Sequence, residues 1–135
     1  MDNLFHINSG VTELVASDFK ITKGKKPVIK HSHFKSKPGF IIFYAPWCIH
    51  CVNSRKKWID LSLIFGNKYK FGAVNAENSY ARNRTLLKHF KVEGFPTIKY
   101  VSPRGTVSDY NGSYEMDDLV DFICKKLDTC GTIIT

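Results

Sequence analysis

The sequence predicts an α/β fold built on a mixed β-sheet, and three observations indicate this class. An unbroken apolar run over 39–45 contains the β-branched and aromatic residues of a strand that is covered on both faces. The stretch 48–65 repeats its apolar residues at the spacing of a helix. Strand-like and helix-like segments then alternate along the rest of the chain, as they do in sheets flanked by helices.

The predicted elements follow one another without an internal repeat. A short strand over 11–16 comes first, and the central strand and the long helix follow at 39–45 and 48–65. The intervening segment 20–38 is interrupted by Gly and Pro residues and is predicted to be a loop with a short strand near 28–30. The later elements are predicted over 71–75 (strand), 79–90 (helix), 97–101 (strand), 107–110 (strand, after a turn at 103–105) and from near Ser113 to Leu127 (helix).

Length and composition place the chain among ordinary globular proteins. Its 135 residues suit one domain over 1–135, with a core over 11–127 and a tail at 128–135. With 43% hydrophobic and 24% charged residues, a disordered, collagen-like or coiled-coil chain is excluded. No apolar run reaches the roughly 18 residues of a membrane span, and the N-terminus lacks the pattern of a secretory signal. We therefore expect a cytoplasmic monomer that does not contact a membrane.

Positive charge is concentrated in the basic segment 20–37. The formal net charge is +8, and lysines outnumber arginines sixteen to four. The segment contains no acid and these lysines: Lys20, Lys23, Lys25, Lys26, Lys30, Lys35 and Lys37. It lacks the arginines and interleaved aromatic residues of proteins that read nucleic-acid bases. We therefore expect a solvated surface or an acidic partner, and no nucleic-acid binding.

Two of the four cysteines, Cys48 and Cys51, form a C-x-x-C pair, whereas Cys124 and Cys130 lie six residues apart far downstream. Zinc sites use four ligands at recognised spacings. The chain lacks such a set and has only an isolated His-x-His at 31–33 as a further hint, so we expect no metal. We expect Cys124 to be a core thiol of the last helix and Cys130 to be a free thiol.

The C-x-x-C pair falls where the central strand meets the long helix. In the first turn of a helix, Cys48 lies near backbone N–H groups without partners in the helix, and the helix dipole favours its thiolate. We therefore expect Cys48 to attack disulfides and Cys51 to resolve the mixed disulfide that results. A lone C-x-x-C can also be half of a metal site or two structural thiols, but its place at a helix start favours the redox interpretation.

The segment around the pair is Phe43-Tyr44-Ala45-Pro46-Trp47-Cys48-Ile49-His50-Cys51. It resembles the active-site segment of the thioredoxin superfamily and is most similar to the catalytic domains of protein disulfide isomerases. A second match, to the segment with the family's cis-proline, is Gly94-Phe95-Pro96-Thr97-Ile98-Lys99-Tyr100, and Tyr110-x-Gly112 before the last helix also agrees. The resemblance covers about 11–127. It implies a thioredoxin fold, a Pro96 loop beside the disulfide, and no organic cofactor.

The resemblance also implies roles for individual residues. His50 would stabilise the thiolate of the first cysteine. The backbone of Phe95, before a cis Pro96, would hold an extended substrate as an added strand. Trp47, Ile49 and Phe95 would form an apolar rim for that substrate. The alternative for Trp47 is packing in the core, where large aromatic residues are usually found.

Three features depart from the family's pattern. The buried Glu and Lys usual in protein disulfide isomerase domains correspond to Ile42 and Ala73, so the expected proton acceptor for Cys51 is missing. Proton transfer must then use water or another group. An Arg that approaches the second cysteine in the family is replaced by Ser113, and Ile49 replaces a small Gly.

The sequence therefore predicts a thiol–disulfide oxidoreductase that acts on proteins bearing disulfides or thiols, with an upstream dithiol or glutathione as its electron donor. The alternative is a redox-inactive thioredoxin-fold module, for binding or for structure, that holds an acidic partner with its basic segment. The missing buried charge pair favours the alternative, whereas the intact C-x-x-C pair favours the enzyme.

Overall fold

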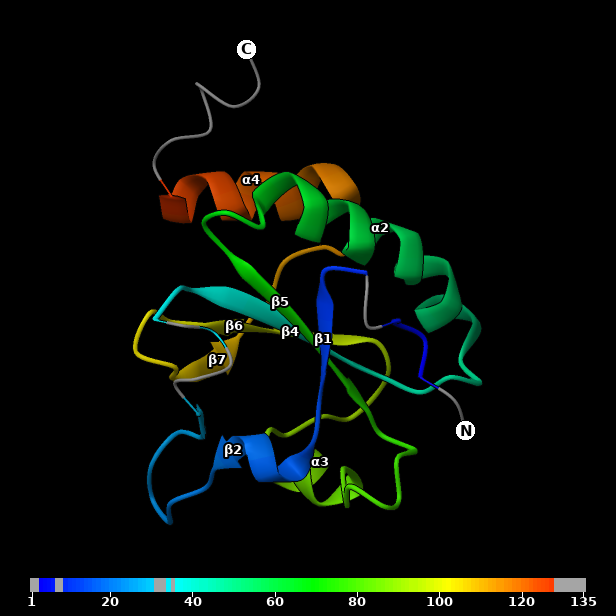
Figure 1. Ribbon diagram of the computed structural model, residues 1–135, viewed down its shortest axis with the longest axis vertical. Helices are drawn as coiled ribbons and strands as arrows, with labels where there is room; N and C mark the ends of the chain where they lie inside the picture. The colour runs from blue at the N-terminus through cyan, green and yellow to red at the C-terminus, as the bar shows by residue number, and fades with distance from the viewer. Residues whose placement is uncertain (1–2, 7–8, 31–33, 35, 128–135) are drawn as a thin grey trace.

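The computed structural model describes residues 3–6, 9–30, 34 and 36–127. Its main sheet has five strands in the order β1–β5–β4–β6–β7 (Figure 1). These strands span Val11–Leu14 (β1), Gly39–Tyr44 (β4), Lys70–Asn75 (β5), Thr97–Val101 (β6) and Val107–Asp109 (β7). β1 and β4 run parallel to β5, whereas β6 is antiparallel to both β4 and β7. The sheet is therefore mixed, as predicted.

The predicted central strand is confirmed in β4. All six of its residues are buried, because neighbouring strands pair with both of its edges and side chains cover both of its faces. Phe40, Ile42 and Tyr44 enter one core cluster, and Ile41 and Phe43 enter the other. This alternation follows from the two-residue period of a strand, and it defines the two faces of the sheet.

Helices cover the two faces unequally (Figure 1). α2 (Ile49–Phe65) and α4 (Met116–Leu127) lie together on one face. The opposite face carries the short α3 (Arg84–His89), the 3-10 turn η1 (Ala16–Asp18) and a hairpin of β2 (Phe19–Lys20) and β3 (Val28–Ile29). The hairpin lies within the region predicted to be a loop with one short strand. None of the described helices is both long and apolar enough to cross a membrane.

The helix predicted over 79–90 is much shorter in the structure, where α3 begins only at Arg84. Arg82 has a positive φ of 57°, which interrupts a right-handed helix. The next residue, Asn83, is fully buried, and its side-chain amide donates to the carbonyls of Leu14 and Asn75. Asn83 also accepts a bond from the N–H of Ala16. These contacts tie the chain to the sheet and leave the preceding segment in turns.

Other element ends differ by a few residues. β1 and β7 stop at Leu14 and Asp109, two and one residues earlier than predicted. α4 begins at Met116 rather than near Ser113. The reason is local, because the Ser113 hydroxyl accepts a bond from the N–H of Glu115 and so forms a turn before the helix.

The segment 3–6, before the predicted core, is part of the packed structure. Phe5 is 4% exposed, and its ring meets that of Tyr44 edge to face at 5.6 Å. The backbone of Leu4 donates to the Tyr44 hydroxyl and accepts a bond from Arg55 of α2. The core therefore begins earlier than residue 11, because this segment covers the end of β4 and the first turns of α2.

Candidate active site

The C-x-x-C pair occupies the junction between β4 and α2. β4 ends at Tyr44, and the N–H of Cys48 closes a turn onto the carbonyl of Ala45 at 3.0 Å. Cys48 is the residue that caps α2, and its carbonyl accepts the first helical bond from Val52. Cys51 follows one turn later on the buried side of α2. The helix start predicted from the sequence is confirmed.

The two thiols are free and differ in their surroundings. Burial disfavours the Cys48 thiolate, but bonds from the Cys51 N–H, the Cys51 thiol and the His50 N–H outweigh it and lower the pKa of Cys48. Cys51 is 2% exposed, and burial raises its pKa to about 12, with the nearby Cys48 acting in the same direction. At neutral pH the thiolate is therefore favoured on Cys48, and the proton stays on Cys51.

The loop before β6 brings a second motif to the thiols. The Phe95–Pro96 peptide bond is cis, the isomer that the resemblance implied. The carbonyl of Phe95 lies 3.7 Å from the Cys48 sulfur and accepts the bond of its thiol. Residues 47 positions apart in the sequence thus meet at one point, beside the half-buried Pro96.

Large apolar side chains surround this point at the surface. Trp47 and Ile49 are 60% and 63% exposed, and the ring of Trp47 meets that of Phe95 edge to face at 6.3 Å. The alternative of core packing is therefore wrong for Trp47. Most of the Trp47 surface is available to another molecule, next to the reactive sulfur.

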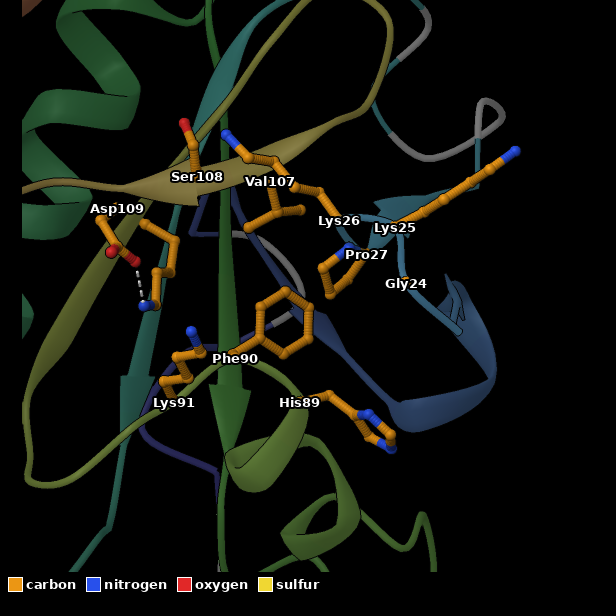
Figure 2. Close-up of a pocket in the computed structure, with 11 residues that line it drawn as sticks. Gly24, Lys25, Lys26, Pro27, His89, Phe90, Lys91, Val107, Ser108 and Asp109 are labelled. Atoms are coloured by element: carbon orange, nitrogen blue, oxygen red, sulfur yellow. Dashed lines mark hydrogen bonds and ion pairs between the residues drawn. The ribbon is translucent and has the colours of Figure 1, made fainter. Parts of the chain in front are cut away.

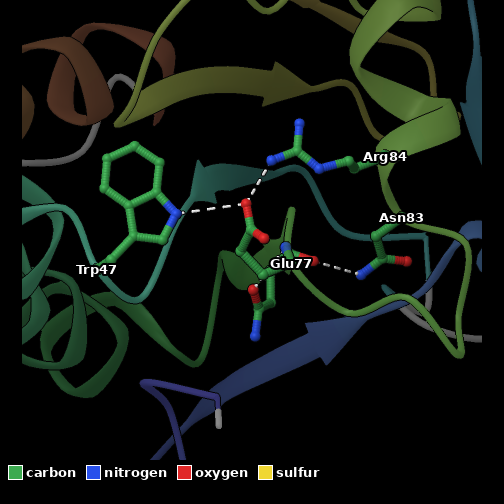
Figure 3. A network of polar contacts seen from close by, with 5 residues as sticks. Trp47, Glu77, Asn83 and Arg84 are labelled. Atoms are coloured by element: carbon green, nitrogen blue, oxygen red, sulfur yellow. Dashed lines mark hydrogen bonds and ion pairs between the residues drawn. The ribbon is translucent and has the colours of Figure 1, made fainter. Parts of the chain in front are cut away.

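A polar network that the sequence did not predict holds Trp47 in place (Figure 3). The indole Nε1 of Trp47 and the guanidinium of Arg84 both donate to the carboxylate of Glu77. The N–H of Glu77 donates to the side chain of Asn75 at the end of β5, and the Asn83 amide donates to the carbonyl of Asn75. These residues come from three separate segments, so no local pattern could indicate the network.

The positions that depart from the family's charge pair are apolar and buried. Ile42 and Ala73 are direct partners in adjacent strands and are 2% and 0% exposed. Ala73 also pairs with Glu13 of β1, which brings a carboxyl group onto the same row of the sheet. Glu13 was not among the site residues predicted from the sequence. The available signal was its spacing, because Glu13 lies two residues after the buried Val11 and so faces the same side of the strand.

The backbone N–H of His50 is one of the groups that stabilise the Cys48 thiolate, and the His50 side chain is exposed. We expect His50→Pro to raise the pKa of Cys48, because proline has no N–H but still fits the first turn of a helix. The Cys48–Cys51 redox potential should become more negative by tens of millivolts, where about 30 mV corresponds to about 1.4 kcal/mol.

The measurement is the equilibrium of the protein with glutathione. His50→Ala is the matched control, because it removes the imidazole and keeps the N–H. Equal shifts in the two variants would show that the imidazole, and not the backbone, tunes Cys48.

The sequence contains two further cysteines and one possible metal-binding motif. Cys124 is disulfide-bonded, so the expectation of a free core thiol was wrong, and Cys130 lies outside the described residues. Among the described residues, no group of three or more His, Cys, Asp or Glu side chains could hold a metal ion. The His-x-His at 31–33 lies outside them.

The fold agrees with comparisons to known proteins. The family model described as thioredoxin matches residues 18–125, and the chain belongs to this family. The protein disulfide isomerase-like 2-1 of Oryza sativa is 36% identical over 100 residues, which are 73% of this chain and 26% of the relative. The protein disulfide-isomerase erp38 of Neurospora crassa is 32% identical over 122 residues, 87% of this chain and 30% of the relative.

Solved structures share the fold at lower sequence identity. The first thioredoxin domain of mouse protein disulfide-isomerase A4 has a TM-score of 0.64 and 24% identity, covering 87% of this chain and 76% of that one. Thioredoxin f from spinach chloroplast has a TM-score of 0.62 and 20% identity, with 85% and 91% covered. The chain spans about a quarter to a third of the length of the curated relatives named above.

Proposed function

We propose that this chain catalyses thiol–disulfide exchange with protein substrates through Cys48 and Cys51. The observation that carries the proposal is the difference between the two thiols. Cys48 is accessible and has a lowered pKa, whereas Cys51 is buried and has a raised one. Exchange needs this division, because the thiolate is the attacking species and the second thiol must wait until a mixed disulfide forms. The protein disulfide isomerase relatives support the same chemistry.

The proposed reaction has two displacement steps. The Cys48 thiolate attacks one sulfur of a substrate disulfide, forms a mixed disulfide and releases the other substrate sulfur as a thiolate. The Cys51 sulfur then attacks Cys48, loses its proton and releases the second substrate thiolate. The substrate gains two electrons and the Cys48–Cys51 pair is oxidised to a disulfide. The electrons move between sulfur atoms only, so the steps use no organic cofactor.

The substrate is proposed to bind along the loop before β6. Phe95 offers its backbone beside the cis-proline Pro96, and an extended peptide could add there as a strand. Trp47, Ile49 and the Phe95 ring supply apolar surface around the sulfur of Cys48. This arrangement favours unfolded or extended protein segments that carry a cysteine.

An upstream dithiol or glutathione is the proposed electron donor when the pair returns to its reduced form. We propose that the chain works as a monomer. The sequence favoured the cytoplasm, but the disulfide of Cys124 supports an oxidising compartment, because disulfides outside active sites are rare in reducing ones. A count of free thiols in protein purified under alkylating conditions tests this point.

The central test of the proposal is Cys51→Ser. This change leaves the attack of Cys48 intact and removes the resolving thiol, so mixed disulfides with substrate should accumulate on Cys48 and disappear when reductant is added. Mass spectrometry after acid quenching measures them. The matched control is Ser54→Ala, one turn further along α2. If Cys51→Ser traps no more substrate than this control, Cys51 is not the resolving thiol.

A second candidate function, the capture of an acidic partner, is favoured by one cavity. This cavity of about 380 Å³ lies between the loop at 24–27, the end of α3 and strands β6 and β7 (Figure 2). Lys99 is 5% exposed and forms an ion pair with Asp109 at 2.6 Å. Lys26 and Lys91 also lower the pKa of Asp109, after its bond to Lys99, and both line the same cavity. The cavity therefore has more lysines than carboxylates, and the excess positive charge can bind an anionic group.

We expect Lys26→Gln with Lys91→Gln to weaken the binding of an acidic peptide severalfold at low salt, and the difference to vanish at high salt. Binding of a glutamate-rich peptide is measured by fluorescence anisotropy. Lys57→Gln with Lys68→Gln removes the same charge from the α2 region and is the control. If the control variant weakens peptide binding as much as the Lys26 and Lys91 variant does, the binding depends on net charge and not on this cavity. Binding that survives Cys48→Ala would favour the binding module over the enzyme.

A further inference from the structure

A carboxyl group lies in the apolar layer that contains the resolving cysteine. Glu13, Ala73 and Ile42 are aligned across β1, β5 and β4 by the strand register. Side chains aligned across parallel strands point to the same face, and Ala73 and Ile42 both pack in the cluster that contains Cys51. Glu13 therefore faces the layer beneath α2. It lies on β1, whereas the family's usual acid would lie at Ile42 on β4, and β5 separates these two strands.

Hydrogen bonds connect this carboxyl group to the end of β4. The Tyr44 hydroxyl donates to Oε2 of Glu13 at 2.5 Å and accepts a bond from the N–H of Leu4. The N–H of Phe5 donates to the same carboxyl oxygen at 3.3 Å. Tyr44 is fully buried, belongs to the same cluster as Cys51, and feels the charge of the Cys51 thiolate. Tyr44 thus holds the carboxyl group at the edge of the buried cluster that contains the thiol.

The protonation properties of these groups suit a proton transfer. Burial raises the pKa of Glu13 to about 7, against the opposing effect of its bonds from Tyr44 and Phe5. Burial, and then the charge of Glu13, raise the pKa of Tyr44, which therefore stays protonated. The pKa of Glu13 thus moves in the opposite direction to those of Glu77 and Asp109, which hydrogen bonds and cationic neighbours lower. The Glu13 carboxyl group is the one of these three that burial affects most. It can therefore take up or release a proton near neutral pH.

Glu13 also has a route to solvent. It lines a cavity of about 480 Å³ together with Asn3, Phe5, His6 and residues 10–12. Three titratable or charged groups lie around Glu13 and Tyr44. They are His6 on the cavity wall, Cys51, and Arg55 of α2, which donates to the carbonyl of Leu4. β5 contributes only Ala73 and Asn75 at this end, and neither titrates. A proton that reaches Glu13 can leave through this cavity.

We propose that Glu13 accepts, through the Tyr44 hydroxyl, the proton that Cys51 loses when it resolves the mixed disulfide. The proposal rests on the exchange reaction described above. As the Cys51 sulfur bonds to Cys48, its proton passes by way of a water molecule to the Tyr44 oxygen, and the hydroxyl proton of Tyr44 passes to the Glu13 carboxylate. The Cys48–substrate bond breaks, and the substrate leaves as a thiolate that takes its proton from solvent. Glu13 then releases its proton to solvent.

The test measures the resolving step alone as a function of pH. Reduced protein is mixed with oxidised glutathione, quenched with acid at short times, and the mixed and internal disulfides are counted by mass spectrometry. In the wild type, the resolution rate should rise through an inflection at the pKa of Glu13, which carboxyl ¹³C NMR measures independently. Glu13→Gln keeps a side-chain acceptor for Tyr44 and Phe5 and should lose this inflection, with resolution at least about tenfold slower at pH 8.

Further variants separate proton transfer from a structural effect. Tyr44→Phe should also slow resolution and remove the inflection, whereas Glu13→Asp should restore part of the rate and Glu115→Gln, at an exposed position, should change nothing. Alkylation of Cys48 by iodoacetamide should be equal in all of them, because the attacking thiol is not involved.

The outcomes distinguish this proposal from the proposed function. A wild type that forms no mixed disulfide contradicts the exchange reaction itself. Mixed disulfides that form and resolve as fast in Glu13→Gln as in the wild type overturn only the role of Glu13. A wild-type rate profile without an inflection at the carboxyl pKa overturns the role of Glu13 even if the variants do not fold. The role of Glu13 is also overturned if Glu13→Gln slows the alkylation of Cys48 by the same factor as it slows resolution.

Discussion

Cys48→Ala is expected to abolish reduction of a disulfide-bonded protein. Cys48 is the accessible thiol of the pair and the one whose pKa is lowered, whereas Cys51 is 2% exposed and holds its proton with a pKa of about 12. The remaining Cys51 cannot reach a large substrate and is not ionised at neutral pH, so it cannot replace the first thiol. The rate should fall to that of the uncatalysed reaction with the electron donor.

The measurement is turnover of a disulfide-bonded protein with glutathione or a dithiol as donor. Cys48→Ser should be equally inactive, because a hydroxyl of similar size occupies the same place without a thiol. Thermal unfolding of both variants should match the wild type, since Cys48 lies at the start of α2 and outside the fully buried core. Turnover that persists in either variant would exclude Cys48 as the nucleophile.

Glu13→Gln is expected to change how protein stability depends on pH. The Glu13 pKa is 4.5 in a solvated chain and about 7 in the fold, where burial is the main cause. Below pH 4.5 the carboxyl group is protonated in both the folded and the unfolded state, so it does not lower the free energy of unfolding. Between the two values only the unfolded chain ionises, so the wild type loses stability as pH rises. At about 1.4 kcal/mol per pKa unit, the loss approaches about 3 kcal/mol by pH 8.

The Gln variant has no such loss, so its free energy of unfolding should gain on the wild type by up to this amount between pH 4 and pH 8. Denaturant unfolding at a series of pH values measures the difference. The control, Glu115→Gln, lies on the exposed surface and should follow the wild type at every pH. If the difference in free energy of unfolding between the wild type and Glu13→Gln stays constant over this pH range, the carboxyl group is solvated in the fold.

The elements around the thiols were predictable because local patterns determine them. The apolar run that became β4 and the helical spacing that became α2 each lie within one element, and a C-x-x-C pair at a helix start places its cysteines one turn apart. α3 was harder to predict. Its first turns are replaced by contacts of Asn83 with the ends of β1 and β5, which lie eight or more residues away.

Some features of the site depended on contacts that no local pattern contains. Trp47 is exposed because the Glu77–Arg84 network and the Phe95 ring hold it at the surface. Residue type alone could not decide between this position and the core. The disulfide of Cys124 was missed for a similar reason, because cysteine spacing indicates neither distance nor orientation in the fold.

The sequence by itself determined where the two reactive thiols lie, at the N-terminal end of a helix after a central strand. Because Cys48 and Cys51 are three residues apart, helix geometry places them about one turn apart on the same side of the helix. Only the tertiary structure decided what surrounds them. The Phe95 carbonyl reaches Cys48 from 47 residues away, and Glu13 meets Tyr44 across 31 residues. Both contacts exist because strand order and register bring distant segments together, and a single sequence does not state either one.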